Sequence, residues 1–195
     1  GDDMVGVLGM SVEAKNSDVA LQRVKINLGT DSKIYSKGYT KLYVTEGSNV
    51  IGSIDLNSST VVKESSTYYI TITGFNYVIP KNVKKNIVIK ADVMSAIDSA
   101  DRTTLSSIAI LIPANGVRGV DGAGIDQYAP TAALTSRSVT FSADLTESAT
   151  LSVSLNSSSP RKAEIVASNG TSDNELDDQT VLVFDVKAEK DAVKI

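Results

Sequence analysis

The sequence predicts an all-β protein built from immunoglobulin-like antiparallel β-sandwich modules, and three observations lead to this prediction. First, short runs rich in Val, Ile, Thr and Tyr recur along the chain with turn-forming residues between them. Second, aromatic residues are few and Ser and Thr abound, which is typical of strands with hydroxylated exposed faces. Third, the first strand segment recurs near residue 181, which indicates a second, incomplete repeat at the C-terminus.

The repeat has a constant offset of 174 residues between segments 7–21 and 181–195. The same positions are apolar in both segments: Val7 and Val181, Leu8 and Leu182, Met10 and Phe184, Val12 and Val186, Ala14 and Ala188, Val19 and Val193, Leu21 and Ile195. The other interpretation is chance, because any two amphipathic strands share an alternating pattern.

The expected strands follow from alternation and from the turns between them. In the first part of the chain they are 5–14, 19–28, 42–44, 50–56, 67–73, 86–93 and 105–112. Residues 46–49 are expected to form a hairpin turn and residues 98–104 a loop. Inside 86–93 we expect Ile87, Ile89, Ala91 and Val93 to point inward. No stretch has the pattern of a convincing helix, and 93–101 offers one turn at most.

The segment Tyr128-Ala129-Pro130-Thr131 is typical of a domain boundary. We therefore expect residues 1–130 to form one β-sandwich module. Residues 131–195 would then be a linker plus the first strands of a second module, or donor strands for another subunit. Strands are expected at 138–142, 150–155, 163–167 and 181–188. A closed barrel is the alternative architecture.

Composition narrows the possible functions. The chain has 195 residues, a formal net charge of −4 and neither His, Cys nor Trp, which excludes Ser-His-Asp and Cys-His catalysis. The charges are well mixed, so nucleic acid is not an expected partner, and no apolar run is long enough to span a membrane. We expect no enzymatic activity. The remaining catalytic possibility is a carboxylate pair as in glycoside hydrolysis, and no pair stands out.

Two acidic stretches are candidate calcium sites, because Ca²⁺ takes six to eight oxygen ligands. Asp121 and Asp126 flank a glycine-rich turn. A denser group precedes the repeated segment: Asp173, Asn174, Glu175, Asp177 and Asp178. A third, weaker candidate is Asp98 with Asp101. In each case the alternative is an ordinary solvated loop.

Two other groups are candidates for glycan binding. Lys81, Lys84 and Lys85 form a small basic turn that could contact anionic glycans or lipid head groups, and the alternative is a solvated hairpin. Tyr68, Tyr69, Phe75 and Tyr77 are candidate stacking rings for sugars. Alternation places Tyr68 and Tyr69 on opposite faces, so at least one of them is expected in the core.

Four segments carry a resemblance to a known class of proteins. They are KLYVTEGSNVIGS at 41–53, TGFNYVIPKNVKKNIVIKADV at 73–93, LSVSLNSSSP at 151–160 and VLVFDVKAEKDAVKI at 181–195. Together they resemble the tandem β-sandwich modules of large bacterial surface-layer-like and adhesin-like proteins. The resemblance implies an extracellular, cell-surface location and a non-enzymatic structural role in a surface layer, fibre or stalk. The alternative is an adhesin or carbohydrate-binding module on a cell surface. No ligand residues carry over.

The repeat also predicts self-association. Val181, Val183 and Asp185 alternate with Leu182, Phe184 and Val186, so a strand here would be apolar on both faces and would need burial. We therefore expect head-to-tail strand exchange, in which the C-terminal strands of one copy complete the N-terminal module of another.

Overall fold

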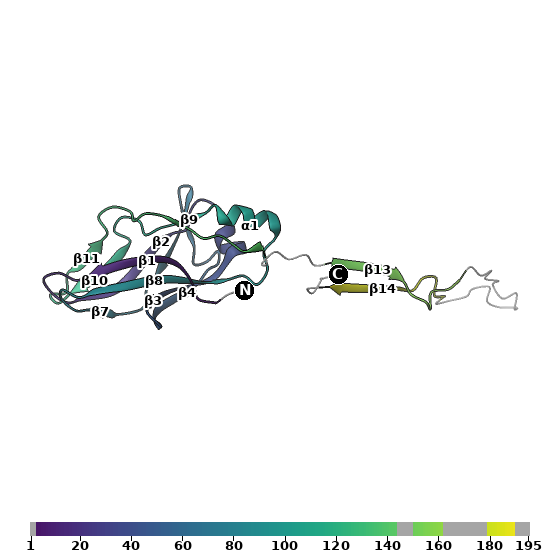
Figure 1. Cartoon of the computed structure of the whole chain (residues 1–195), viewed down its shortest axis with the longest axis horizontal. Coiled ribbons are helices and arrows are strands. Elements are labelled where there is room, and N and C mark those ends of the chain that lie inside the picture. Colours follow the sequence, from purple (N-terminus) through teal and green to yellow (C-terminus); the bar gives the residue numbers. More distant parts are fainter. Residues whose placement is uncertain (1–2, 144–149, 162–178, 190–195) are drawn as a thin grey trace, which may run out of the picture. The chain divides into compact units, whose positions relative to one another are not determined.

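The computed structural model describes residues 3–143, 150–161 and 179–189, which fall into two units, Gly1–Thr146 and Glu147–Ile195. The first unit is an antiparallel β-sandwich, as the sequence predicts (Figure 1). Its strands are β1 (Val5–Glu13), β2 (Val19–Asn27), β3 (Tyr39–Glu46), β4 (Asn49–Asp55), β5 (Val62–Glu64), β6 (Thr67–Ile72), β7 (Tyr77–Ile79), β8 (Lys84–Val93), β9 (Ala109–Ile110), β10 (Val117–Asp121), β11 (Asp126–Ala129) and β12 (Arg137–Ser138). Its helices are a π-helical turn, η1 (Ile34–Gly38), and α1 (Ser99–Ser106).

Two sheets form the layers of the sandwich. One has the strand order β1-β8-β3-β4, and the other has the order β11-β10-β2-β6-β5 with β7 also pairing with β2. All named strand pairs within the sheets are antiparallel. β9 and β12 make a separate two-stranded pair. Sequence neighbours often lie in different sheets, so the chain crosses between layers, for example from β1 to β2 and from β7 to β8.

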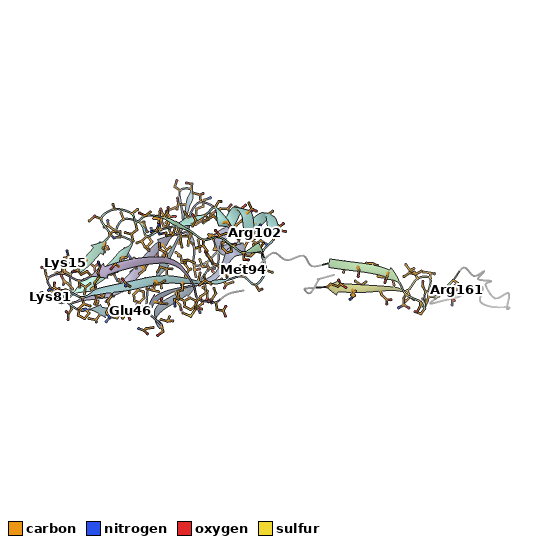
Figure 2. The ribbon with its side chains drawn as sticks, in the orientation of Figure 1. Lys15, Glu46, Lys81, Met94, Arg102 and Arg161 are labelled. Atoms are coloured by element: carbon orange, nitrogen blue, oxygen red, sulfur yellow. The ribbon has the colours of Figure 1, made fainter. Side chains whose placement is uncertain are left out.

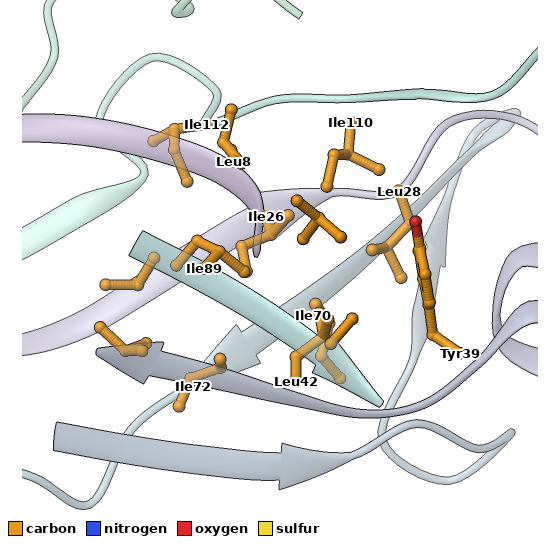
Figure 3. Packing of buried hydrophobic residues seen from close by; sticks show 14 of the residues in the cluster. Leu8, Ile26, Leu28, Tyr39, Leu42, Ile70, Ile72, Ile89, Ile110 and Ile112 are labelled. Carbon is orange, nitrogen blue, oxygen red and sulfur yellow. The ribbon is translucent and has the colours of Figure 1, made fainter. Parts of the chain in front are cut away.

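The core lies between the two sheets because alternate residues of their strands are aliphatic. In β8 the alternation places Ile87, Ile89 and Ala91 in the core as expected, all fully buried, and Val93 is partly buried. β2 contributes Leu21, Val24 and Ile26 from the opposite layer. Figure 3 shows Ile26, Leu42, Ile70 and Ile89 within this single cluster. An aliphatic core of this size removes any need for disulfide staples.

The strand β2 departs from strict alternation, since Leu21 and Val24 both face inward. The register with β10 explains this: Arg23 lies opposite Arg118 and Leu21 opposite Gly119, so that Gln22 has no partner on β10. One extra residue on β2 is a β-bulge, which shifts the inward face by one position. β10 approaches closely here, because a Cβ on Gly119 would lie 2.4 Å from a methyl group of Val19.

The helix α1 corrects the sequence prediction of a loop at 98–104 and a strand at 105–112. Asp98 caps the helix, because its side chain accepts a hydrogen bond of 2.8 Å from the Ala100 N–H. Leu105 is fully buried and anchors the helix on the core. Only Ala109–Ile110 of the expected strand forms a strand.

The first unit continues past the boundary expected at residue 130. β12 pairs with β9, and only Ser138 of the strand expected at 138–142 lies in a strand. Phe141 is 3% exposed and belongs to the core, and its carbonyl accepts a hydrogen bond from the Arg102 guanidinium. The segment after β11 therefore packs on the core of the first unit and is part of it.

The second unit contains a two-stranded antiparallel ribbon, β13 (Thr150–Leu155) paired with β14 (Phe184–Glu189). We call it the C-terminal ribbon. The strand expected at 150–155 is confirmed, and the strand expected at 181–188 begins three residues later than predicted. The segment 163–167 lies outside the described residues.

Candidate functional site

The glycine-rich loop between β10 and β11 holds the first candidate calcium ligand, Asp121. Its Oδ1 accepts hydrogen bonds of 2.9 Å from the Ala123 and Ile125 N–H groups, and its Oδ2 accepts one of 2.9 Å from the Gln127 side chain. These bonds, the Ile125 N–H foremost, hold the pKa of Asp121 below its ordinary value. The carboxylate thus shapes the β10–β11 turn in the way an Asx turn does.

Asp126 starts β11 on the other side of this loop. Its Oδ2 lies 3.6 Å from the Arg118 guanidinium and accepts a hydrogen bond of 3.1 Å from the Tyr128 hydroxyl. The two candidate carboxylates therefore have separate protein partners. Among the described residues, no group of three or more Asp, Glu, His or Cys side chains could hold a metal ion. The second candidate group, Asp173, Asn174, Glu175, Asp177 and Asp178, lies outside the described residues.

The third acidic pair has structural roles at the start of α1. Asp98 caps the helix, and the Asp101 carboxylate lies 2.8 Å from the Lys33 ammonium beside η1. The hydrogen bond to Asp101 raises the pKa of Lys33. This ion pair joins the two helical segments at one end of the sandwich.

A groove of about 380 Å³ lies where the β1–β2 turn meets the β10–β11 hairpin. Its walls include the aliphatic side chains of Val12, Leu21, Ile79 and Val117, and its rim carries Glu13, Lys15, Asp121, Gln127 and Tyr128. Figure 2 shows Lys15 and Lys81 together at this end of the first unit, where Ala14 and Lys81 form a β-bridge. The Asp121 carboxylate accepts three N–H donors, so it is poorly suited to act as a base here.

The basic turn is held in place by acidic partners. The Lys81 N–H donates a 2.7 Å hydrogen bond to Asp18, and the Lys85 ammonium lies 3.1 Å from Glu46. The hydrogen bond to Glu46 raises the pKa of Lys85. This arrangement offsets part of the positive charge of the turn.

The candidate sugar-stacking rings each contact other residues of the first unit. Tyr68, Phe75 and Tyr77 pack against the core, so the expectation that at least one of Tyr68 and Tyr69 is a core residue fits the packing. Tyr69 lies beneath the Lys25 ammonium, 4.3 Å from the ring centroid. Phe75 covers the backbone of β4 at Gly52, where an added Cβ would lie 2.6 Å from the ring. These contacts use the rings for packing within the unit.

A further polar contact fixes the start of the chain. The Tyr43 hydroxyl donates a 2.6 Å hydrogen bond to the Asp92 carboxylate, whose other oxygen accepts one of 2.8 Å from the Met4 N–H. The bond to Asp92 is the largest cause that raises the pKa of Tyr43 to about 12. The phenol therefore stays protonated at neutral pH and ties β3 to β8 and to the residue before β1.

The most unusual surface is on the C-terminal ribbon, and the sequence reasoning did not predict its form. The register pairs Leu151 with Ala188, Val153 with Val186 and Leu155 with Phe184, and these six apolar residues share one face. The other face carries Ser152, Ser154, Asp185, Lys187 and Glu189. We call the first the apolar face of the ribbon. Its side chains are exposed: Val153 by 62%, Leu155 by 70% and Phe184 by 54%.

This register corrects the expectation that the strand is apolar on both faces. The strand begins at Phe184, so Val181 and Val183 lie outside it. The Asn156 N–H donates a hydrogen bond to the Val183 carbonyl, so Val183 lies next to the residue that follows β13, just before β14 begins. What the sequence did contain was the strict alternation of 150–155, and matching it against 184–189 in antiparallel register would have predicted the apolar face.

Comparison with protein-family models, with curated proteins and with solved structures found no match to this chain. In the parts of the chain that the structure describes, none of the helices has the length and apolar character needed to cross a membrane. The functional argument therefore depends on the geometry of the two units.

Proposed function

We propose that this protein is a non-enzymatic structural building block of an extracellular surface assembly, such as a surface layer, a fibre or a stalk. The observation that carries the proposal is the apolar face of the ribbon, which exposes six apolar side chains on one side of two strands. An isolated two-stranded ribbon is marginally stable at best in water. A surface of this kind is suited to association with another β-layer.

The segments that carry the resemblance to bacterial surface modules support the proposal through their place in the fold. The segment 41–53 spans the β3–β4 hairpin, and 73–93 contains β7, the basic turn and all of β8. Both segments are scaffolding: they supply core residues such as Leu42, Ile79 and Ile89. Self-association is part of the proposal, and head-to-tail strand exchange through the C-terminal strands is one route to an open-ended assembly.

The test is electron microscopy of the purified chain over a range of concentrations. We expect ordered filaments or sheets, and we expect Val153→Asp to abolish them because it places a charge on the apolar face. Ser154→Asp adds the same charge one residue along, on the polar face, and is the matched control. A chain that stays monomeric at every concentration, or a variant Val153→Asp that assembles like the wild type, contradicts the assembly role.

A glycan array distinguishes the adhesin alternative. Specific binding of one glycan class by the monomeric chain, lost on Tyr128→Ala in the groove but retained in Val153→Asp, would favour a carbohydrate-binding module. We expect no specific glycan signal.

A further inference from the structure

The groove of the first unit lies where one sheet of the sandwich ends before the other. β1 is the last strand of the sheet β1-β8-β3-β4, whereas the facing sheet continues beyond β2 through β10 and β11. The inward residues of these last two strands border the groove: Val117, Gly119, Gln127 and Ala129. Gln127 and Ala129 are exposed, because no described strand of the first sheet lies beyond β1 to cover them. The first sheet is therefore narrower than the second on this side.

β1 also has an unpaired backbone edge along this groove. Of the four strands that end the two sheets it is the longest, with nine residues against seven in β4, four in β11 and three in β5. Among the described strands it pairs with β8 alone. Residues around β12 lie near its first half, where Gly6 and Gly9 border one pocket together with Arg137. The second half of β1 is therefore the accessible part, and a free edge of this kind accepts an added strand.

β14 of the C-terminal ribbon has the complementary features. Its pairing with β13 uses one edge and, in the described part of the chain, leaves the other edge unpaired. Phe184, Val186 and Ala188 lie on the apolar face, and Asp185 and Lys187 alternate with them on the polar face. All of them are exposed. β14 thus offers a backbone edge and apolar side chains on one side of it.

We propose that β14 of one copy pairs antiparallel with the second half of β1 of another copy, so that its apolar side chains enter the groove between β1 and β11. The inference rests on the proposed function, because it names the surface that receives the ribbon when copies associate. The added strand would widen the narrower sheet and cover the inward side of β10 and β11. The ribbon in turn would gain the further strands that a two-stranded ribbon needs for stability.

Charge selects one register for this pairing. Glu13 and Lys15 are exposed, and neither has an ion-pair partner in the described part of the chain. In the proposed register Lys187 comes opposite Glu13, and Asp185 comes opposite Lys15. A shift by two residues keeps the apolar face inward but sets like charges opposite each other, which is destabilising: Asp185 meets Glu13 in one direction, and Lys187 meets Lys15 in the other. The charged pairs are exposed, so they set the register, and burial of the apolar side chains supplies most of the affinity.

The apolar side chains suit the inner side of the same register. Val186 comes opposite Ala14 and Ala188 opposite Val12, and both of these β1 residues border the groove. Each pair joins a larger and a smaller side chain, which lets neighbouring strands pack closely. Phe184 comes just beyond the end of β1, where the β1–β2 turn also borders the groove. The charged and the apolar residues of β14 therefore agree on one position.

A disulfide between copies tests the register, and the chain has no Cys of its own to interfere. A chain with Lys15→Cys and Asp185→Cys should form a ladder of covalent oligomers in oxidised glutathione, because directly opposite residues on paired strands lie within reach of a disulfide. The matched control is Lys15→Cys with Lys187→Cys, which are diagonal neighbours in this register. We expect the control to give at least about tenfold less covalent product, measured by gel electrophoresis without reductant.

A charge in the groove tests the receiving surface. Ala129→Asp places a carboxylate on the inward side of β11, at an exposed position where the first unit can keep its fold. We expect the concentration needed for association to rise by about tenfold or more, because the carboxylate would be buried beneath the added strand. Val78→Asp is the matched control, since Val78 is exposed on β7 and does not border the groove. Thermal melting checks that both variants fold.

The outcomes distinguish this inference from the proposed function. If copies associate but the Lys15→Cys, Asp185→Cys chain forms no ladder, or if Ala129→Asp associates like the wild type, the groove is not the receiving surface and the assembly role still stands. A disulfide that closes within single chains also overturns the inference, because the ribbon would then occupy the groove of its own chain. A chain that stays monomeric at every concentration overturns both.

Discussion

The rings of Tyr39 and Phe141 pack with their centroids 5.4 Å apart and their planes inclined by 36°. Tyr39 begins β3 and Phe141 follows β12, so this contact joins residues about a hundred positions apart within one core. Burial raises the pKa of Tyr39, as expected for a phenol removed from water. The contact shows why the first unit includes the segment after residue 130.

The first prediction tests the contribution of this segment. Phe141→Ala should lower the free energy of unfolding of the first unit by about 3–5 kcal/mol, because it removes a buried aromatic ring and leaves a cavity. Urea unfolding of the full chain measures this change. Phe184→Ala is the matched control, because it removes the same type of ring from the ribbon, where the Phe184 side chain is 54% exposed. If the first unit of Phe141→Ala unfolds at the same urea concentration as that of the wild type, the sandwich is complete without this segment.

The second prediction concerns the cap of α1. Asp98→Ala removes the acceptor of the Ala100 N–H, and N-cap losses cost about 1 kcal/mol. We expect a lower urea midpoint with an unchanged slope, because the unfolded surface stays the same. Ser99→Ala changes the next, exposed residue and should shift the midpoint much less. Equal midpoints for the two variants would contradict the capping role.

Strong alternation made much of the sandwich predictable from the sequence. Ile87, Ile89 and Ala91 alternate with polar residues, and burial of one face of β8 follows directly from that period. The β3–β4 hairpin was predictable because Gly47 lies among turn-forming residues between two β-prone runs, and in the structure this glycine has a positive φ of 59°.

Other elements depend on tertiary contacts that the sequence does not display. α1 has eight residues and a single buried one, Leu105, so it has little helical periodicity to detect. β10 and β11 are short, β10 contains Gly119, and β10 pairs with β2 on one side and with β11 on the other. The pairing of β10 with β2 joins segments far apart in the sequence, so it could not be predicted from the local pattern.

The candidate sites show a similar division. The sequence singled out Asp121 as an oxygen ligand, but the groups that it binds in the structure are mostly backbone N–H donors, which the sequence pattern does not distinguish. For the ribbon, the apolar residues were recognised but the register was not, and the register alone decides that one face carries all of them.

The third prediction follows from the lowered pKa of Asp121. A carboxyl group with a lower pKa in the folded state adds stability above its unfolded pKa of about 3.9, and this stability is lost as the pH falls through the folded value. Asp121→Asn should therefore reduce the loss of stability between neutral pH and acid. Denaturant titrations at a series of pH values measure it. Asp55→Asn, at a carboxylate whose side chain is 71% exposed, is the control. A wild-type pH dependence in Asp121→Asn would contradict this account.

The fourth prediction concerns calcium and the acidic groups Asp121 with Asp126 and residues 173–178. If a folded site binds Ca²⁺, the free energy of unfolding rises by about 2.7 kcal/mol at a hundredfold excess over Kd. We expect a higher melting temperature in millimolar Ca²⁺ than in EDTA. Asp173→Asn combined with Asp177→Asn should remove the increase, whereas Asp121→Asn should preserve it, because the Asp121 carboxylate already accepts three N–H donors. Identical melting curves in Ca²⁺ and EDTA would exclude such a site.

The last prediction tests how copies associate. Deletion of Val181–Ile195 removes β14 and leaves β13 without its partner, while the first unit keeps every described strand. If head-to-tail strand exchange builds the assembly, the shortened chain should be monomeric at concentrations where the full chain forms filaments or sheets. Sedimentation velocity over a hundredfold range of concentration measures this, with electron microscopy of the same samples.

Point variants then locate the contact: Val186→Asp should act like the deletion because Val186 lies on the apolar face, and Lys187→Asp should act like the wild type. Assembly by the shortened chain would show that copies meet through the first unit, whose two sheets end in the edge strands β1, β4, β5 and β11.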